Sequence, residues 1–436
     1  MKNTVPLFIF ILSILGCDHK AKNSNQNIIS SDIANFWNAY DLIVATNDSI
    51  MQYKYLDSLY IQKGTLGLKG IMKARNYSQQ DYIDAINSYP KFWKSIRENT
   101  LKTDAYVSEL NSGIERIKKV YPELKPAKIY FTIGALRTPG TTIDSLVLIG
   151  SELAMTDGNT VSSEFQGDIQ RGRRIYFDSN PIDNLVLLNV HEYVHTQQKP
   201  VVNNLLSYVL HEGIAEFVSV TALGVPSSAP AIEYGKQNEA VKTKFENELF
   251  FGYNRHEWLW SDYKNEFNVR DLGYYIGYQI AEINYNKAED KQAAIKEMIE
   301  LDYTNESQVE DFVDRTHFFS KPLEVMYEDF DKSRPTVLKI KQFENNSTMV
   351  NPETKEITVE FSEPLNGLNT SVDFGELGAE SFPKVTDRFW EPGNQAWTLV
   401  VSLEPNKHYQ ILISNNFRTE KGIPLKPFLI EFQTTK

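Results

Sequence analysis

Apolar residues recur at steps of three and four along the first quarter of the chain. Ile33, Phe36, Tyr40 and Ile43 would share one face of a helix, and similar stripes recur up to about residue 124. Such stripes normally form a buried core. The pattern predicts a helical region over residues 30–124.

The hydrophobic pattern changes near residue 128, where two apolar runs are typical of strands. These runs cover residues 129–134 and 146–150, and a Pro/Gly/Thr segment at 138–142 separates them. We expect two strands joined by a loop, which would form a small sheet before the central helices.

Two long helices are predicted after this sheet. Asn180 can cap the first helix and Pro181 suits its first position, so that the helix would run through the 190s. The second would cover residues 203–223 and end at Gly224, because glycine readily adopts the left-handed conformation that closes a helix. Further helices are expected to about residue 331.

The hydrophobic period changes from helical spacing to two after residue 335. Ile357, Val359 and Phe361 illustrate the alternation, which recurs in short segments separated by turn residues. This pattern predicts an all-β sandwich over residues 334–436. The expected fold class is therefore α+β, with a mostly helical domain at residues 30–333 that contains a small sheet.

Composition and charge narrow the class of protein. A length of 436 residues suggests two or three domains, and 41% hydrophobic against 23% charged residues is typical of globular chains. The formal net charge of −12, without a basic stripe, argues against nucleic acid as a partner. The chain has one cysteine, so it forms no intrachain disulfide.

The position of that cysteine is informative. Lys2, an apolar run at 5–15 and then a small residue before Cys17 resemble the signal and lipobox of bacterial lipoproteins. The resemblance implies a signal peptide at residues 1–17, a lipid on Cys17 and a flexible tether at 18–29. It predicts a membrane-anchored protein of the bacterial cell envelope, periplasmic or at the cell surface, and leaves the leaflet open.

The segment that carries chemistry lies in the first predicted central helix. His191, Glu192 and His195 form the pattern HExxH. Positions i and i+4 project from one helix face, so both imidazoles can bind one metal ion while the glutamate lies beside them. The pattern predicts a zinc site with a neighbouring base.

A third ligand must come from elsewhere in the chain. The metzincin pattern would need Gly at 198 and His at 201, but the chain has Gln198 and Val201, which excludes that family. The next predicted helix instead carries His-Glu-Gly-Ile-Ala-Glu-Phe at residues 211–217.

HExxH followed by a second helix with an E-G-x-A-E-aromatic stretch resembles the gluzincin metallopeptidases. The resemblance covers residues 30–331 and is strongest to zinc proteases of bacterial envelopes. It implies a zincin-like domain with one Zn²⁺ per chain, Glu212 as third ligand and Glu216 as the carboxylate that orients a zinc-bound histidine. His211 is an alternative third ligand, but it points about 100° away from Glu212, and only Glu212 shares a face with Glu216.

The mechanism that this resemblance implies uses the fourth zinc position for a water molecule, with Glu192 as general base. An additional donor must stabilise the developing oxyanion. Tyr274, followed three residues later by Gly277, resembles the Tyr-x-x-Gly stretch of zinc aminopeptidases.

Other residues compete for the oxyanion role. Tyr275 and Tyr278 are alternatives to Tyr274, and His256 is a weaker one. An aromatic core, with no catalytic tyrosine, explains the same stretch equally well.

The strand at residues 146–149 occupies the place of the edge strand that pairs with extended substrates in gluzincins. Glu152 could then bind a substrate amine, but the aminopeptidase motif G-x-M-E-N is absent, so an exopeptidase is not supported. Arg137, in the loop between the two strands, is interpreted as a solvated or structural charge.

The last quarter of the chain carries a second resemblance. Residues 350–366 are similar to the bacterial Ig-like module of surface-layer and secreted proteins. The resemblance implies a spacer or binding appendage.

The resulting hypothesis is a lipid-anchored zinc metallopeptidase that cleaves peptide or protein substrates. One alternative is a catalytically silent surface scaffold that retains the gluzincin fold, although the presence of Glu192 argues against it. Another is a zinc hydrolase of non-protein amides. Substrate specificity, exo or endo cleavage and oligomeric state do not follow from the sequence.

Overall fold

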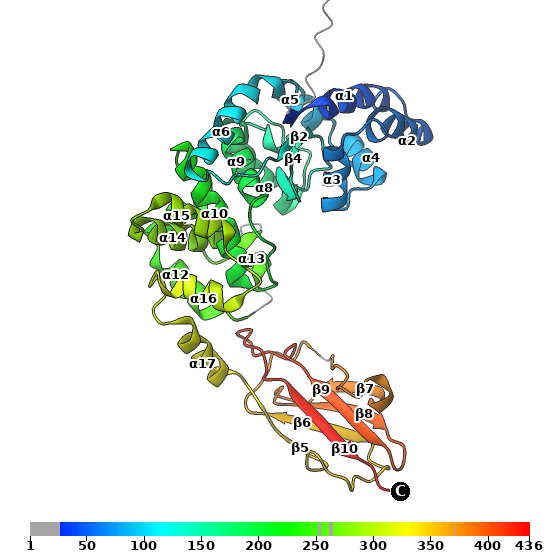
Figure 1. Ribbon diagram of the computed structural model, residues 1–436. Helices are drawn as coiled ribbons and strands as arrows, with labels where there is room; N and C mark the ends of the chain where they lie inside the picture. The colour runs from blue at the N-terminus through cyan, green and yellow to red at the C-terminus, as the bar shows by residue number, and fades with distance from the viewer. Residues whose placement is uncertain (1–26, 252–253, 261–264, 370) are drawn as a thin grey trace, which may run out of the picture. The chain divides into compact units, whose positions relative to one another are not determined.

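The computed structural model describes residues 27–251, 254–260, 265–369 and 371–436. It is an α+β protein, as predicted (Figure 1). Cys17 and the predicted signal peptide lie outside the described residues, and so does most of the predicted tether. Among the described residues, no helix combines the length and the apolar character that crossing a membrane requires.

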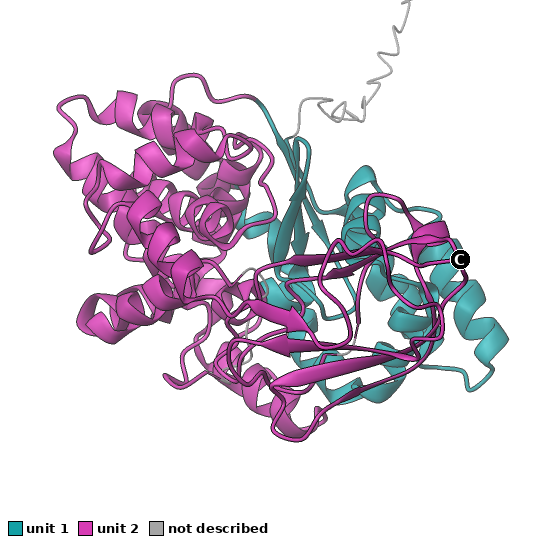
Figure 2. Ribbon diagram, turned by 90° about the horizontal axis from the view of Figure 1, so that it is seen from below, with its two compact units in different colours: residues 1–107, 126–155 teal, residues 108–125, 156–436 magenta. Residues whose placement is uncertain are grey.

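The chain divides into two compact units (Figure 2). Unit 1 comprises residues 1–107 and 126–155, and unit 2 comprises residues 108–125 and 156–436. The range 30–333, which the sequence suggested as one domain, is therefore split between them. The boundary between the two units depends on contacts between segments distant in the sequence, and a local sequence pattern does not reveal such contacts.

Unit 1 is mostly helical between residues 31 and 107, which confirms the predicted stripes. Its helices are α1 (Ser31–Ile43), α2 (Ser49–Leu56), α3 (Leu66–Arg75), α4 (Gln79–Ser88), α5 (Pro90–Leu101) and the short α7 (Ser151–Ala154). A π-helical turn, Asp57–Ile61, continues α2. Phe36 and Ile43 of the α1 stripe are fully buried, and Tyr40 nearly so.

The sheet of unit 1 has four strands in the order β1-β2-β4-β3. They are β1 (Ile28–Ile29), β2 (Lys128–Thr132), β3 (Gly140–Ile143) and β4 (Leu146–Gly150). β4 pairs in parallel with β2 and antiparallel with β3. Two predictions are wrong here: the segment expected as a loop contributes β3, and the tether range 18–29 includes β1.

The position of β4 inside the sheet corrects the expectation of a substrate-binding edge strand at 146–149, because both of its sides are already paired. Glu152 is also wrongly interpreted as an amine receptor. Its side chain is fully buried, and its carboxylate accepts the backbone N–H of Gly134 at 2.7 Å and of Leu136 at 3.1 Å. Arg137 is structural, since it pairs with Asp81 at 2.7 Å.

Unit 2 begins with a helical region that surrounds one large hydrophobic core. Its helices are α6 (Val107–Val120), α8 (Gly167–Asp178), α9 (Leu185–His195), α10 (Leu205–Leu223), α11 (Pro230–Gln237), α12 (Glu239–Glu248), α13 (Arg255–Leu259), α14 (Leu272–Lys287), α15 (Lys291–Glu300), α16 (Glu306–Asp314) and α17 (Leu323–Ser333). α10 contributes most to this core and packs on both α9 and α14.

The two predicted central helices are present, with a difference at the start of the first. A 3₁₀ turn, Pro181–Asn184, precedes α9, and Asn180 is left-handed with φ 49°. The Asn180 side chain accepts the N–H of Gly158 at 2.9 Å and therefore does not cap the helix. Gly224, with φ 64°, ends α10 as predicted.

The last quarter of the chain, within unit 2, consists of two antiparallel sheets around a common core (Figure 1). One sheet has the order β5-β6-β8-β7, and the other pairs β9 with β10. The strands are β5 (Val337–Ile340), β6 (Glu356–Phe361), β7 (Lys384–Trp390), β8 (Ala396–Ser402), β9 (His408–Ile413) and β10 (Phe428–Gln433). The sequence did not predict β7, because most of its side chains are exposed and its residues do not alternate between apolar and polar.

Candidate metal centre

Helices α9 and α10 bring the three predicted ligands together. His191 and His195 are one turn apart on α9, and Glu212 faces them from α10. The two Nε2 atoms are 3.0 Å apart, and Glu212 Oε2 lies 3.5 Å from His191 Nε2 and 3.3 Å from His195 Nε2. Three potential ligand atoms therefore surround one point.

The orientation of the imidazoles determines what can occupy that point. His191 Nδ1 lies 3.0 Å from Glu216 Oε2. Burial alone would raise the pKa of Glu216, but the hydrogen bonds from His191 and Ser227 keep it below its ordinary value, so the carboxylate is ionised and accepts only. Nδ1 must then donate its proton to Glu216, which leaves Nε2 as the ring nitrogen that faces His195.

The three distances fit a zinc ion. A tetrahedral zinc with bonds of about 2.0–2.1 Å holds its ligand atoms about 3.3–3.4 Å apart. The observed separations of 3.0, 3.3 and 3.5 Å bracket this value. Two imidazoles and one carboxylate are also the ligand set of catalytic zinc sites that keep one position open.

The electrostatics of the cluster favour a positive charge at its centre. Burial lowers the pKa of His191, but the carboxylates of Glu212 and Glu216 outweigh it and raise the pKa to about 10. Burial would likewise raise the pKa of Glu212, yet His195 and His191 hold it well below its ordinary value. The carboxylates thus attract whichever cation lies between the imidazoles.

Glu216 occupies the orienting position that the sequence predicts. It lies four residues after Glu212 on α10, and its second oxygen accepts a hydrogen bond from Ser227 Oγ. Ser227 follows the end of α10 and had no recognisable signal in the sequence. The two linked hydrogen bonds, His191 to Glu216 and Ser227 to Glu216, fix the orientation of the His191 ring.

Glu192 lies on α9 next to the first ligand, and only 8% of it is exposed. Burial raises the pKa of Tyr274 well above its ordinary value, and the charge of Glu192 is among the groups that add to this shift, after Glu212 and Asp271. The structure therefore brings Glu192 into the same charged environment as the ligands.

Tyr274 is the tyrosine that reaches the cluster. Its hydroxyl donates to Glu212 Oε2 at 2.7 Å, and its ring stacks on His191 with centroids 6.0 Å apart. Tyr275 instead packs against Gly235, and Tyr278 packs edge-on against Phe217. His256 lies exposed on α13.

The approach of Tyr274 depends on two glycines where α10 crosses α14. A Cβ atom at Gly277 would overlap the carbonyl oxygen of Val209, and one at Gly213 would overlap the backbone of α14. The helices touch backbone to backbone at this point, which leaves Tyr274, one turn before Gly277, beside Glu212. Gly213 therefore provides packing room for α14.

His211 lies beside the cluster without belonging to the ligand set. Its ring stacks on His195 with centroids 4.5 Å apart and planes 11° from parallel. Burial and the neighbouring His195 lower the pKa of His211 to about 3, so the ring is neutral. The described residues that could hold a metal are His191, His195 and Glu212, and His211 is not among them.

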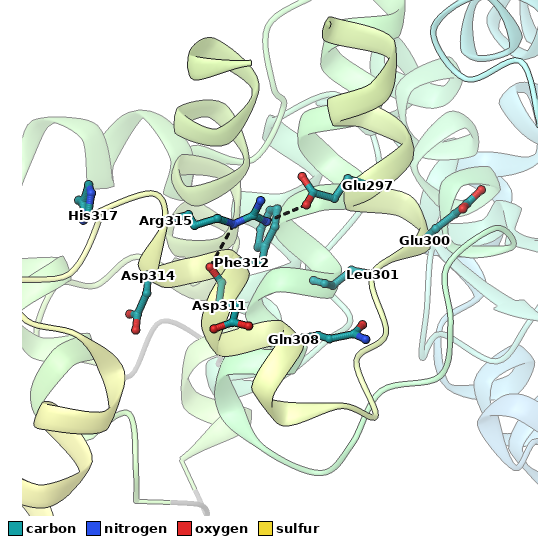
Figure 3. A pocket seen from close by; sticks show the side chains of 9 residues that line it. All are labelled: Glu297, Glu300, Leu301, Gln308, Asp311, Phe312, Asp314, Arg315 and His317. Carbon is teal, nitrogen blue, oxygen red and sulfur yellow. Dashed lines mark hydrogen bonds and ion pairs between the residues drawn. The ribbon is translucent and has the colours of Figure 1, made fainter. Parts of the chain in front are cut away.

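A polar hollow of about 880 Å³ lies elsewhere in unit 2 (Figure 3). It is lined by Glu297, Glu300, Leu301, Gln308, Asp311, Phe312, Asp314, Arg315 and His317. Arg315 donates to Glu297 at 2.7 Å, and Glu300 accepts from Lys296 at 2.6 Å. These charges are neutralised by neighbours, and the hollow includes none of the three candidate ligands.

Comparison with known proteins assigns no family. No family model matches the chain, and no curated protein matches it. The N-terminal part of the bacterial S-layer protein SbsC aligns over 93% of this chain and 78% of its own, with 13% identity and a TM-score of 0.19. Domains 1–6 of SbsC also align over 93% of this chain, over 45% of their own, with the same identity and TM-score. At these TM-scores the alignments carry no argument about fold or function.

Proposed function

We propose that the protein is a zinc-dependent peptidase of the gluzincin type. The observation that carries the proposal is the set of three interatomic distances, 3.0, 3.3 and 3.5 Å, among His191, His195 and Glu212. Both imidazoles turn Nε2 toward the same point, beside the carboxylate of Glu212, so a cation bound there would have three ligand atoms around it. This arrangement of the three side chains therefore favours a bound metal ion.

The residues around the ligands supply the remaining parts of an amide hydrolase. Zinc, when bound, polarises the scissile carbonyl and acidifies water at its open position. Glu192 acts as the general base that takes a proton from water and passes it to the leaving amine. Tyr274, whose hydroxyl reaches Glu212, donates to the developing oxyanion.

A peptide substrate suits this arrangement because peptide hydrolysis needs both a base and an oxyanion donor. We infer that the chain acts on peptides or proteins in the bacterial cell envelope, held to a membrane by a lipid on Cys17. The two-sheet region at 334–436 is proposed as an Ig-like spacer or binding appendage. Replacement of Cys17 by Ala should then release the protein from the membrane fraction.

The decisive test compares wild type with Glu192→Gln on a library of quenched fluorescent peptides and on labelled casein. We expect the variant to keep zinc and to lose activity by about 10²–10⁴-fold, the usual contribution of a general base. Equal cleavage by both proteins would exclude Glu192 as the base. Zinc binding without any cleavage by wild type would favour the silent scaffold or a non-protein amide.

A further inference from the structure

Gln198 contacts the second histidine ligand and two groups behind it. Its Oε1 lies 2.7 Å from Nδ1 of His195, and its Nε2 donates to the carbonyl oxygen of His211 at 3.0 Å. The same Nε2 donates to the hydroxyl of Tyr303 at 3.1 Å. Gln198 follows α9 by three residues and faces the side of His195 away from the ligand cluster.

The orientation of the Gln198 amide follows from these contacts. A backbone carbonyl only accepts hydrogen bonds, so the group that faces His211 must be the NH₂ of the amide. The carbonyl of the amide therefore faces His195, and an amide oxygen only accepts. Nδ1 of His195 must then be the protonated nitrogen, which leaves the lone pair on Nε2, 3.0 Å from His191 Nε2.

The anchor behind Gln198 is rigid. Tyr303 is fully buried, and its hydroxyl reaches the carbonyl of Met298 at 3.5 Å, which leaves its oxygen free to accept from Gln198. The ring of His211 packs between its neighbours, 4.5 Å from His195 and 5.2 Å from Tyr303. Rotation of the amide would lose its hydrogen bond to the His211 carbonyl.

We propose that Gln198 is a positioning residue that holds His195 in the tautomer and ring orientation required to bind the metal ion. The inference rests on the proposed zinc site and adds a residue that HExxH and the second helix do not contain. His191 is held by a carboxylate, Glu216, whereas His195 is held by a neutral amide. The two ligands thus reach the same tautomer through different partners.

The adjacent glutamine provides a matched control. Gln197 accepts the N–H of Lys125 at 2.8 Å and donates to its carbonyl at 3.1 Å. It contacts neither histidine ligand by a hydrogen bond. Methionine is similar in size to glutamine but has no amide. Comparison of the two Gln→Met variants therefore separates loss of a side-chain amide in this segment from loss of the bond to His195.

The test measures zinc affinity by competition with a chromophoric chelator for wild type, Gln198→Met, Gln198→Glu and Gln197→Met. We expect Gln198→Met to weaken zinc binding by about 10–100-fold, as loss of an outer partner of a zinc-bound histidine does. Gln198→Glu keeps an acceptor for His195 but places a second oxygen against the His211 carbonyl, so it should recover only part of the affinity. Gln197→Met should stay within about threefold of wild type, well below the cost of losing such a partner.

A second measurement reads the tautomer directly. In ¹⁵N-histidine NMR spectra, wild-type His195 should carry its proton on Nδ1, and the zinc-free Gln198→Met protein should show both tautomers. Equal zinc affinity and an unchanged tautomer in Gln198→Met would overturn the inference. Absence of zinc binding by wild type would instead overturn the proposed function.

Discussion

Two glutamates, the buried Glu152 in unit 1 and the half-buried Glu212 in unit 2, show how similar side chains serve different purposes. In unit 1, Glu152 is fully buried, and two backbone N–H groups bond its carboxylate and fix the loop after β2. In unit 2, Glu212 faces two imidazole nitrogens and a tyrosine hydroxyl. Backbone amides hold a carboxylate as part of the fold, whereas converging side-chain donors leave it able to bind a ligand. The identity of the partners separates the two carboxylates.

The largest expected effect contrasts these two residues. Glu212→Gln should reduce zinc affinity by more than 100-fold, the upper end for an outer partner, because it removes a ligand charge. Glu152→Gln should leave zinc affinity unchanged and lower the free energy of unfolding by about 1–3 kcal/mol, since one backbone N–H loses its acceptor. Chelator competition and urea unfolding measure the two quantities. Reduced zinc binding in Glu152→Gln would contradict the distinction.

A tyrosine pair tests the catalytic side of the cluster. Tyr274→Phe should lower kcat by about 10²–10³-fold with zinc still bound, because it removes the oxyanion donor. Tyr278→Phe, on the same helix but packed against Phe217, should leave kcat within about twofold, since it removes no oxyanion donor. Steady-state kinetics with a peptide that the wild type cleaves would measure kcat for both variants. A similar kcat for both variants would remove Tyr274 from the mechanism.

Removal of the metal should destabilise unit 2. Zinc at about 100 times its Kd stabilises a folded protein by about 2.7 kcal/mol, because the site forms only in the native state. Addition of EDTA should therefore lower the Tm of the wild type and leave that of Glu212→Ala unchanged. Calorimetry reports the difference. An equal fall in both proteins would indicate that EDTA acts elsewhere.

The smallest expected effect concerns the α10–α14 crossing. Gly277→Ala should cost about 1–3 kcal/mol of stability, because its methyl group overlaps the Val209 carbonyl. Gly172→Ala, in α8, meets no atom within 4 Å and should stabilise by about 0.5–1 kcal/mol. Urea unfolding of both variants compares them. If Gly277→Ala leaves the free energy of unfolding unchanged, the two helices separate easily, contrary to this account.

The candidate ligands were predictable because their spacing is local. His191 and His195 share a face through helix geometry alone, and Glu212 and Glu216 repeat that spacing on the next helix. Gln198 and Ser227 were not predictable as site residues, because each lies after a helix end, where no periodicity indicates direction.

The fold was predictable in its elements and less so in their assembly. Apolar periodicity located α1, α9, α10 and most strands, since each buries one face. β3 and β7 were missed because polar side chains dominate them. The place of β4 inside its sheet and the division into two units arise from contacts between distant segments, which periodicity does not encode.

The central claim is that His191, His195 and Glu212 hold one zinc ion, and metal content tests it most directly. Wild type without residues 1–17 and its Glu212→Ala variant would be purified, supplied with zinc, desalted and analysed by mass spectrometry of the metal. The account predicts about one zinc per wild-type chain, as for a single catalytic site, and essentially none in the variant. Wild type that retains no zinc after this treatment would contradict it.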